Sequence, residues 1–212
     1  PSRNNTTEVF NKELTNALLP VDMYLIGPEH IVLHLLYSRF FTKFLRDAGY
    51  VSFDEPFMKM RHQGMILGPD GKKMSKSKGN TVDPMDIINS GYGADALRVF
   101  ELFIAPYDQD TSWNTKGVPG AYRFLQRVWN VVQEYIDASD GSVSEVTSKE
   151  LNKTAHKTVK KVTGDLESLS FNTAVAAMME MTNDLHLIKA KESIVRSAAW
   201  TYVVESLIQL LA

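Results

Sequence analysis

The fold of the first part of the chain is set by one segment, VDMYLIGPEHIVLHLLYSRFFTKFLRDAG (Val21–Gly49). Its opening, VDMYLI, is mostly apolar and is followed by Gly27 and Pro28, which predicts a short buried strand over 21–26. The rest is densely apolar and stops at Gly49, so we predict a helix with that glycine as its C-terminal cap. Lys59–Leu67 reads as a second strand. Strand, helix, strand in this order predicts parallel pairing, with a ligand-binding edge where the strands end.

The middle of the chain carries clear helix signals. Asp83 stands before Pro84, so it can cap a helix that starts at the proline, and Asp86 lies near the positive end of the helix dipole. The run GYGADALRVFELFIAP predicts a further helix, closed by Pro106. The segment 107–116 then reads as a polar loop with one tryptophan.

From Pro119 onward we predict a wholly helical tail. Apolar residues recur at spacings of three and four in two stretches separated by the linker ASDGSVSEVTS. Phe171–Ala190 and Ser193–Leu211 form two more amphipathic segments, which predicts a bundle of about four helices. This pattern assigns Trp129 and Trp200 to packing within the bundle. The two apolar stripes are Tyr122, Leu125, Trp129, Val132 and Ile136, and Leu151, Ala155, Val159, Val162, Leu166 and Leu169.

Composition narrows the class of protein. The chain has 212 residues, with 23 Lys and Arg against 25 Asp and Glu, so any nucleic-acid binding must come from local patches. It has no cysteine, which excludes disulfides and thiolate zinc sites and is typical of a reducing compartment. No apolar run is long enough to span a bilayer, and the polar N-terminus has no signal-peptide core. We therefore expect a cytoplasmic protein that does not bind membranes.

Positive charge is concentrated in one loop, GPDGKKMSKSKGN (Gly68–Asn80). Such a loop can simply be an exposed, solvated turn. Its glycines, however, let the backbone approach a ligand, and its serines and lysines supply hydroxyl and ammonium donors. A loop of this kind after a strand of a βαβ unit is suited to cradle a polyphosphate, although it lacks the Walker pattern. Met74 is its one apolar residue and could anchor it.

The five residues Lys-Met-Ser-Lys-Ser (Lys73–Ser77) match the signature loop of the class I aminoacyl-tRNA synthetases. The surrounding sequence resembles the bacterial-type leucyl-tRNA synthetases, closely over 5–134 and more loosely in the helical tail. Isoleucyl and valyl enzymes share the loop and the bundle, but they differ in the EHxxxH helix and in WNTKGVPG. The segments that carry the resemblance are LPVDMYLIGPEHIVLHLLYSRFF, QGMILGPDGKKMSKSKGN, GADALRVFELF and WNTKGVPGAYRFLQRVW.

The resemblance implies an α/β plus all-α fold. Residues 1–80 would form the C-terminal half of a Rossmann-type nucleotide-binding fold, ending in the signature loop. Residues 81–117 would be a stem-contact or connecting segment. Residues 118–212 would form a truncated helical-bundle anticodon-binding domain.

The activity implied by the resemblance is that of a leucine–tRNA ligase. ATP with Mg²⁺ is the substrate, leucine is activated to leucyl-adenylate, and the leucyl group is transferred to tRNA(Leu). Lys73 and Lys76 would be catalytic, because their ammonium groups would neutralise the β- and γ-phosphates as pyrophosphate leaves. The ATP or adenylate site would be formed by Gly27, His30, Gln63, Gly64, Met65, Met74, Ser75 and Ser77.

Glu29, His30 and His34 permit three interpretations. His30 and His34 share one helix face, as zinc ligands often do, but the order E-H-x-x-x-H offers no third ligand, so we predict no bound metal. The three residues could also be polar groups at an exposed helix end. The resemblance instead implies a leucine site, with Glu29 holding the α-ammonium group and the imidazoles shaping the side-chain pocket.

The chain also departs from the family pattern. Ile26 and Pro28 stand where family members commonly have GGxEH, which could crowd the adenosine site and which removes a backbone donor. No His-x-Gly-His motif and no editing insertion are found. We therefore expect a fragment of a monomeric parent enzyme, inactive alone.

Basic residues in the tail have two interpretations. They could form an ordinary solvated face, or they could contact tRNA phosphates without reading sequence. The residues concerned are Arg123, Arg127, Lys153, Lys157, Lys160 and Lys161. A non-catalytic tRNA-binding relative, or an isoleucyl or valyl enzyme fragment, is the alternative to the leucine enzyme.

Overall fold

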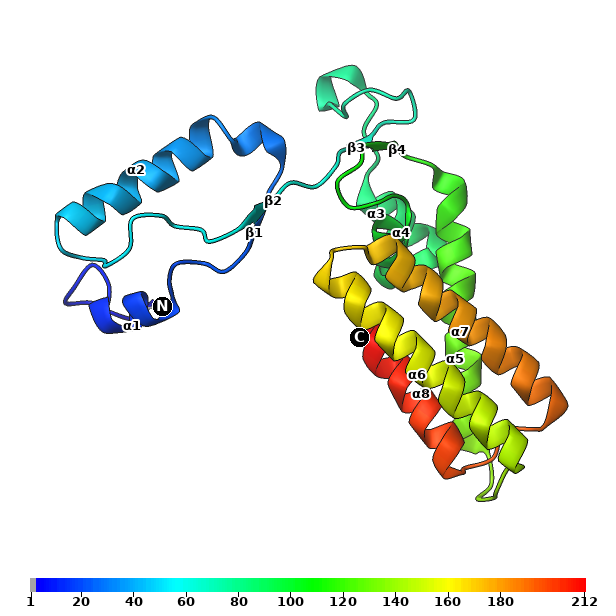
Figure 1. Cartoon of the computed structure of the whole chain (residues 1–212). Helices are drawn as coiled ribbons and strands as arrows, with labels where there is room; N and C mark the ends of the chain where they lie inside the picture. The colour runs from blue at the N-terminus through cyan, green and yellow to red at the C-terminus, as the bar shows by residue number, and fades with distance from the viewer. Residues whose placement is uncertain (1–2) are drawn as a thin grey trace. The chain divides into compact units, whose positions relative to one another are not determined.

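The computed structural model describes residues 3–212. These divide into two compact units, the first ending at Met65 and the second running from Ile66 to Ala212. Each unit is described by itself below, with the elements labelled as in Figure 1. In the part described, no helix is both long and apolar enough to cross a membrane.

The first unit contains the predicted strand–helix–strand succession. Its elements are α1 (Lys12–Leu18), β1 (Tyr24–Leu25), the 3₁₀ turn η1 (Pro28–His30), α2 (Leu33–Asp47) and β2 (Met60–Arg61). Strands β1 and β2 pair in parallel, with Tyr24 opposite Met60 and Leu25 opposite Arg61. The parallel pairing is confirmed, although the strands are shorter than predicted and α2 begins only after the 3₁₀ turn.

Helix α2 ends at the glycine that the sequence indicates. Gly49 has a φ of +74°, and its N–H bonds to the carbonyl of Arg46 at 2.9 Å. The next N–H, of Tyr50, bonds to the carbonyl of Leu45 at 2.8 Å. This pair of bonds is the Schellman arrangement, which satisfies carbonyls that the helix leaves open at its end.

The predicted strand Lys59–Leu67 is not one strand. Only Met60–Arg61 pairs with β1, whereas Ile66–Leu67 forms β3 and pairs in parallel with β4 (Thr111–Ser112). The prediction was wrong because both pieces have strand-like composition, and the change of partner between them leaves no local signal. The same pairing corrects the expected loop over 107–116, which contains β4 and the buried Trp113.

The second unit is mainly helical, and its helices have the expected caps. The Asp83 side chain accepts the N–H of Met85 at 2.8 Å and caps α3 at Pro84. A wide turn, η3 (Ile88–Tyr92), leads to α4 (Gly93–Phe103), and the short turn η4 (Thr115–Gly117) precedes the bundle. The bundle is made of α5 (Val118–Asp137), α6 (Glu145–Glu167), α7 (Phe171–Lys191) and α8 (Ala198–Leu211), and its four helices confirm the prediction.

The register of α5 differs from the predicted stripe. Its buried residues are Val118, Ala121, Phe124, Val128 and Val131. Trp129 is 65% exposed and Ile136 is 52% exposed, so the assignment of Trp129 to the core was wrong. Trp200 has no exposed surface, which confirms its assignment. Two apolar stripes run along α5, and only packing against α4, α7 and α8 decides which of them is covered.

An ion pair in the first unit gives a prediction for pH dependence. Arg39 holds Glu55 through two hydrogen bonds, of 2.8 and 2.6 Å, and with Lys43 it lowers the pKa of that carboxyl to about 2. A carboxyl group whose pKa is lower in the folded than in the unfolded chain stabilises the fold at pH values above its ordinary pKa. This contribution is lost as the pH falls through the pKa of the folded state. The free-energy difference between the native chain and Glu55→Gln should therefore shrink from about pH 5 to about pH 2. Chemical denaturation at each pH measures it, and a constant difference would contradict the pairing.

Candidate functional site

The lysine loop (residues 68–80) is carried by a parallel strand pair in the second unit. It leaves the end of β3, turns at Gly68–Lys72, and contains the 3₁₀ turn η2 (Lys76–Lys78). Gly79, with a φ of +65°, closes that turn. The strand beneath is fixed by β4, since the N–H of Trp113 bonds to the carbonyl of Leu67 at 2.8 Å. The loop therefore projects from the end of a strand that is held in place by its neighbour, as expected of a phosphate-binding loop.

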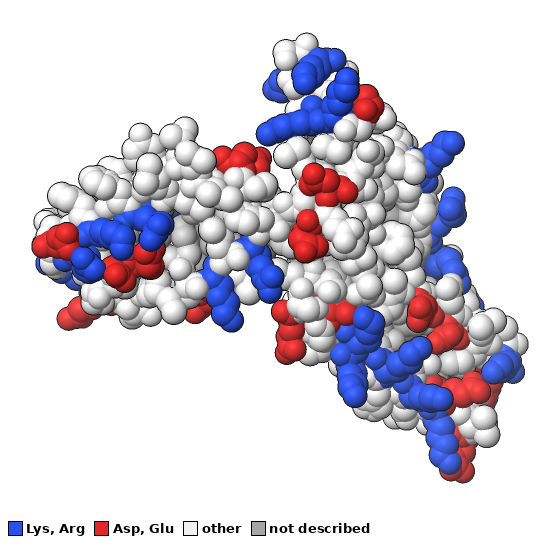
Figure 2. Space-filling model, turned by 45° about the horizontal axis from the view of Figure 1, so that its top comes forward, with Lys and Arg blue, Asp and Glu red and all other residues white. Residues whose placement is uncertain are grey.

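The charges on the loop are available to a ligand. Lys73 and Lys76 are both exposed. Within residues 3–212, neither ammonium group has a carboxylate within ion-pairing distance. Figure 2 shows basic side chains gathered where the loop projects, and all of the loop's basic residues are lysines. Unpaired ammonium groups on a short loop favour a multiply charged anion such as a polyphosphate.

Met74 anchors the loop, as its position in the sequence suggested. It is partly buried and packs against a core cluster that includes Leu97, Phe100 and Trp113. Trp113 in turn meets Phe100 edge-on, with ring centroids 5.2 Å apart. One apolar side chain thus fixes the loop to the rigid part of the unit while the lysines on either side remain in solvent.

The end of β1 in the first unit gathers the other predicted site residues. Glu29 folds back over Gly27, where an added Cβ would lie only 2.5 Å from the Glu29 carboxylate. His30 and His34 lie one helical turn apart, and their rings meet edge-on at 5.8 Å. All three polar side chains are exposed. A carboxylate and two imidazoles are therefore exposed on the turn and helix that follow β1, and such groups can bind an amino acid's ammonium group and polar parts of a nucleotide.

Two residues of this edge were missed by sequence reasoning. The Tyr24 hydroxyl bonds to Nε2 of His34 at 2.7 Å, and its ring stacks on Phe57 at 4.0 Å. His62 Nδ1 lies 3.0 Å from the carbonyl of Ile26, so this nitrogen carries the proton and donates. Tyr24 could have been found as the polar residue near the end of a predicted strand. His62 depends on the register of β1 and β2, which the sequence leaves open.

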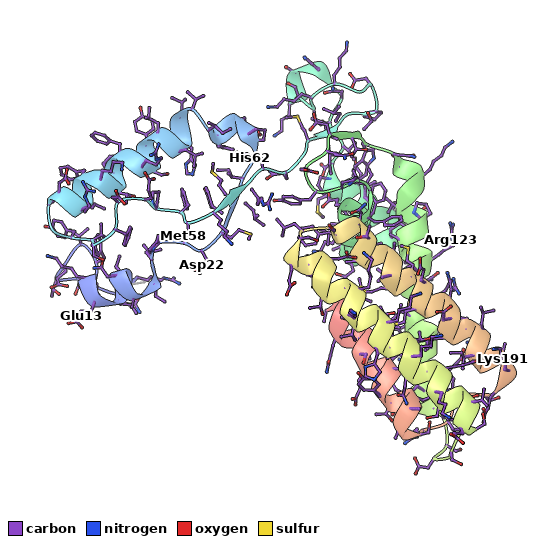
Figure 3. All side chains as sticks on the ribbon, viewed as in Figure 1. Glu13, Asp22, Met58, His62, Arg123 and Lys191 are labelled. Atoms are coloured by element: carbon purple, nitrogen blue, oxygen red, sulfur yellow. The ribbon has the colours of Figure 1, made fainter. Side chains whose placement is uncertain are left out.

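Gln63, Gly64 and Met65 follow β2 and so leave the same edge as Gly27. The N–H of Ile26 bonds to the carbonyl of Arg61 at 3.1 Å, which sets the register there. Figure 3 labels His62 at this point of the chain. Gln63 is exposed, and Gly64 and Met65 are half-buried. The parallel pairing therefore brings the predicted leucine and adenine segments to one strand end.

Metal ligation has no support in the described residues. Across 3–212, no three His, Asp or Glu side chains are grouped closely enough to hold an ion. His34 already uses Nε2 in its bond with Tyr24.

The basic residues of the tail differ in how free their charges are. Lys161 bonds to Asp165 at 2.5 and 2.7 Å, and Arg127 bonds to Asn183 at 2.5 Å. Lys157 lies 3.9 Å from Glu180. Lys153 and Lys160 are exposed on α6, and Arg123 is exposed on α5, labelled in Figure 3. Figure 2 shows acidic side chains among the basic ones, so this surface is only moderately positive.

Comparison with known proteins gives consistent matches. Residues 3–114 match the family described as tRNA synthetases class I (I, L, M and V), and residues 148–212 match the anticodon-binding domain of tRNA ligase. Leucine--tRNA ligase of Bdellovibrio bacteriovorus is 48% identical over 98% of the chain, and that of Citrifermentans bemidjiense is 48% identical over 96%. The chain spans about a quarter of the length of these relatives, 25% of each.

A solved structure agrees over nearly the whole chain. It is the ternary complex of Agrobacterium radiobacter K84 agnB2 LeuRS with tRNA and LeuAMS, with a TM-score of 0.81 and 35% identity. The match covers 96% of this chain and 27% of the chain in that structure. The arrangement of a catalytic-domain part followed by a helical anticodon-binding domain is thus common to both.

Proposed function

The chain belongs to the class I tRNA synthetases, and from this premise we propose that it is a segment of a leucine–tRNA ligase. The parent enzyme would activate leucine with ATP and transfer it to tRNA(Leu), and the segment alone would be inactive. The proposal rests on the lysine loop, which presents two unpaired ammonium groups from an anchored strand end. The identity of its relatives supports leucine over isoleucine or valine.

Lys73 and Lys76 would act on the phosphates of ATP. In adenylate formation, the leucine carboxylate attacks the α-phosphorus, and the bond to the β-phosphate oxygen breaks. Negative charge then grows on the departing pyrophosphate. Preorganised ammonium groups stabilise that charge more in the transition state than in the ground state, which lowers the barrier. Mg²⁺ would enter with ATP as part of the substrate, and the Ser75 and Ser77 hydroxyls would add donors to the phosphates.

The edge of the first unit would bind the other partners in the reaction. Glu29 would hold the leucine ammonium group, because its exposed carboxylate can pair with a cation. His30 and His34 would shape the site beside it, with His34 oriented by Tyr24. Gly27 and residues 63–65 would contact the adenine and ribose mainly through backbone groups, since glycines allow a ligand to approach the backbone closely.

We place tRNA contact on the basic residues of α5 and α6. Arg123, Lys153 and Lys160 are the stronger members of the predicted set, because they are exposed and have no ion-pair partner among the described residues. Lys157, Lys161 and Arg127 already have protein partners that tRNA phosphates would have to replace. These contacts would position the tRNA without reading its sequence.

The proposed activity predicts leucine-dependent exchange of pyrophosphate into ATP by the complete protein. We expect a rate with leucine roughly 100-fold or more above that with isoleucine or valine at equal concentration, because a pocket shaped for one branched side chain discriminates on this scale. The 212-residue segment under the same conditions is the control and should show no exchange. Exchange that prefers isoleucine or valine would refute the leucine assignment, and no exchange with any amino acid would favour a tRNA-binding role.

A further inference from the structure

The side chain of Asn80, at the end of the lysine loop, is hydrogen-bonded to residues near the start and in the middle of the loop. Its Oδ1 accepts the N–H of Ser75 at 2.8 Å. Its Nδ2 lies 3.1 and 3.2 Å from the two carboxylate oxygens of Asp70 and 3.3 Å from the carbonyl of Lys73. One amide therefore binds the start of the loop and the backbone on both sides of Met74, at the point where the loop returns to the core.

Asp70 is the partner of Asn80 in this set of hydrogen bonds, and we call the two side chains together the clamp. Besides Asn80, its Oδ1 accepts the N–H of Lys72 at 3.1 Å. The hydrogen bond from Asn80 is the main reason that the pKa of Asp70 is lowered. Gly68 makes room for the pair, since a Cβ there would lie 2.8 Å from the backbone carbonyl oxygen of Asn80 and 2.8 Å from Asp70 Oδ1. The carboxylate is thus held ionised in contact with the amide at the base of the loop.

We propose that Asn80 and Asp70 are positioning residues, which hold the backbone of Lys73–Ser77 so that the two lysines meet the phosphates of ATP in a fixed geometry. The inference rests on the proposed function. Met74 fixes the loop by one apolar contact, which leaves the flanking backbone free to turn about it. The amide supplies the missing constraint, because it binds the groups immediately before and after Met74. Without it, the lysines would spend less time in the reactive arrangement, and small misplacements are costly in rate.

The test uses four variants of the complete protein in leucine-dependent ATP–pyrophosphate exchange. Asn80→Ala should lower kcat roughly 10- to 100-fold, with little change in KM for leucine. Asn80→Asp should lower it at least as much at neutral pH, because two carboxylates would then face each other, and the loss should lessen toward acid pH as one becomes protonated. The exchanged pair Asp70→Asn with Asn80→Asp restores the amide–carboxylate bond and keeps an acceptor for the N–H of Ser75, but it loses the donor to the Lys73 carbonyl, so it should recover part of the activity lost in Asn80→Asp.

Asn114→Ala is the matched control. Asn114 also closes a turn of the second unit with its side chain, accepting the N–H of Lys116 at 3.1 Å, but it lies outside the lysine loop. It should leave kcat within about twofold of the native value, as expected of an exposed turn substitution.

Limited trypsin digestion of the same proteins gives a readout that does not depend on activity. Asn80→Ala should speed cleavage at the loop lysines, and the exchanged pair should slow it again. Native kcat and native cleavage rates in Asn80→Ala would overturn the proposal, as would an exchanged pair no better than Asn80→Asp. A native protein without leucine-dependent exchange, but with faster cleavage in Asn80→Ala, would refute the proposed function and leave the clamp standing as a structural feature only.

Discussion

Replacement of Lys76 by alanine in the complete protein should lower kcat of adenylate formation by roughly 100- to 1000-fold, the loss seen when one preorganised electrostatic group is removed from a charged transition state. The ammonium group is exposed and lacks an ion-pair partner within residues 3–212, so it can reach a phosphate without breaking an existing bond. Leucine-dependent pyrophosphate exchange measures the effect. Affinity for tRNA(Leu), measured separately, should change little.

Lys78→Ala is the control for this variant. Lys78 belongs to the same 3₁₀ turn but lies outside the five signature residues, so its loss removes an equal charge from the loop. It should reduce the exchange rate only a few fold, through the weaker long-range field. Equal losses for Lys76→Ala and Lys78→Ala would mean that the loop acts only through its net charge. Equal losses of exchange and tRNA binding in Lys76→Ala would contradict its assigned role.

The second large effect concerns stability. Trp200→Ala should lower the free energy of unfolding of the helical unit by about 3–5 kcal/mol, because Trp200 is fully buried in the bundle core and its removal leaves a cavity. Urea denaturation of the 212-residue chain, followed by far-ultraviolet circular dichroism, measures the loss. Among residues 3–212 the indole nitrogen of Trp200 finds no hydrogen-bond partner, so Trp200→Phe should cost much less than the alanine change.

Trp129→Ala is the matched control, since it removes the same side chain from the same bundle. Trp129 is 65% exposed, so its loss should change the unfolding free energy by less than about 1 kcal/mol. The pair of variants tests the register of α5 directly. A loss at Trp129 as large as that at Trp200 would mean that the predicted stripe of α5 faces the core, and it would contradict the observed packing.

The candidate site was found only in part from sequence. Lys73–Ser77 could be identified because its five contiguous residues match the signature loop of a known family, so the signal is local in the sequence. Tyr24 and His62 were not predicted, although Tyr24 bonds to the predicted site residue His34 and His62 bonds to the carbonyl of Ile26. Asn80 and Asp70 lie within the quoted loop, yet their roles depend on hydrogen bonds that close the loop on itself.

The sequence by itself determined most of the helices, two of their caps and the signature loop. Asp83 caps α3 and Gly49 closes α2 through bonds to residues a few positions away, so neighbouring letters are sufficient to predict them. Tertiary structure alone decided that Ile66–Leu67 leaves the first strand pair for Thr111–Ser112, and that Val128 rather than Trp129 faces the core. These outcomes depend on competition among partners distant in the chain, and a local pattern is compatible with more than one of them.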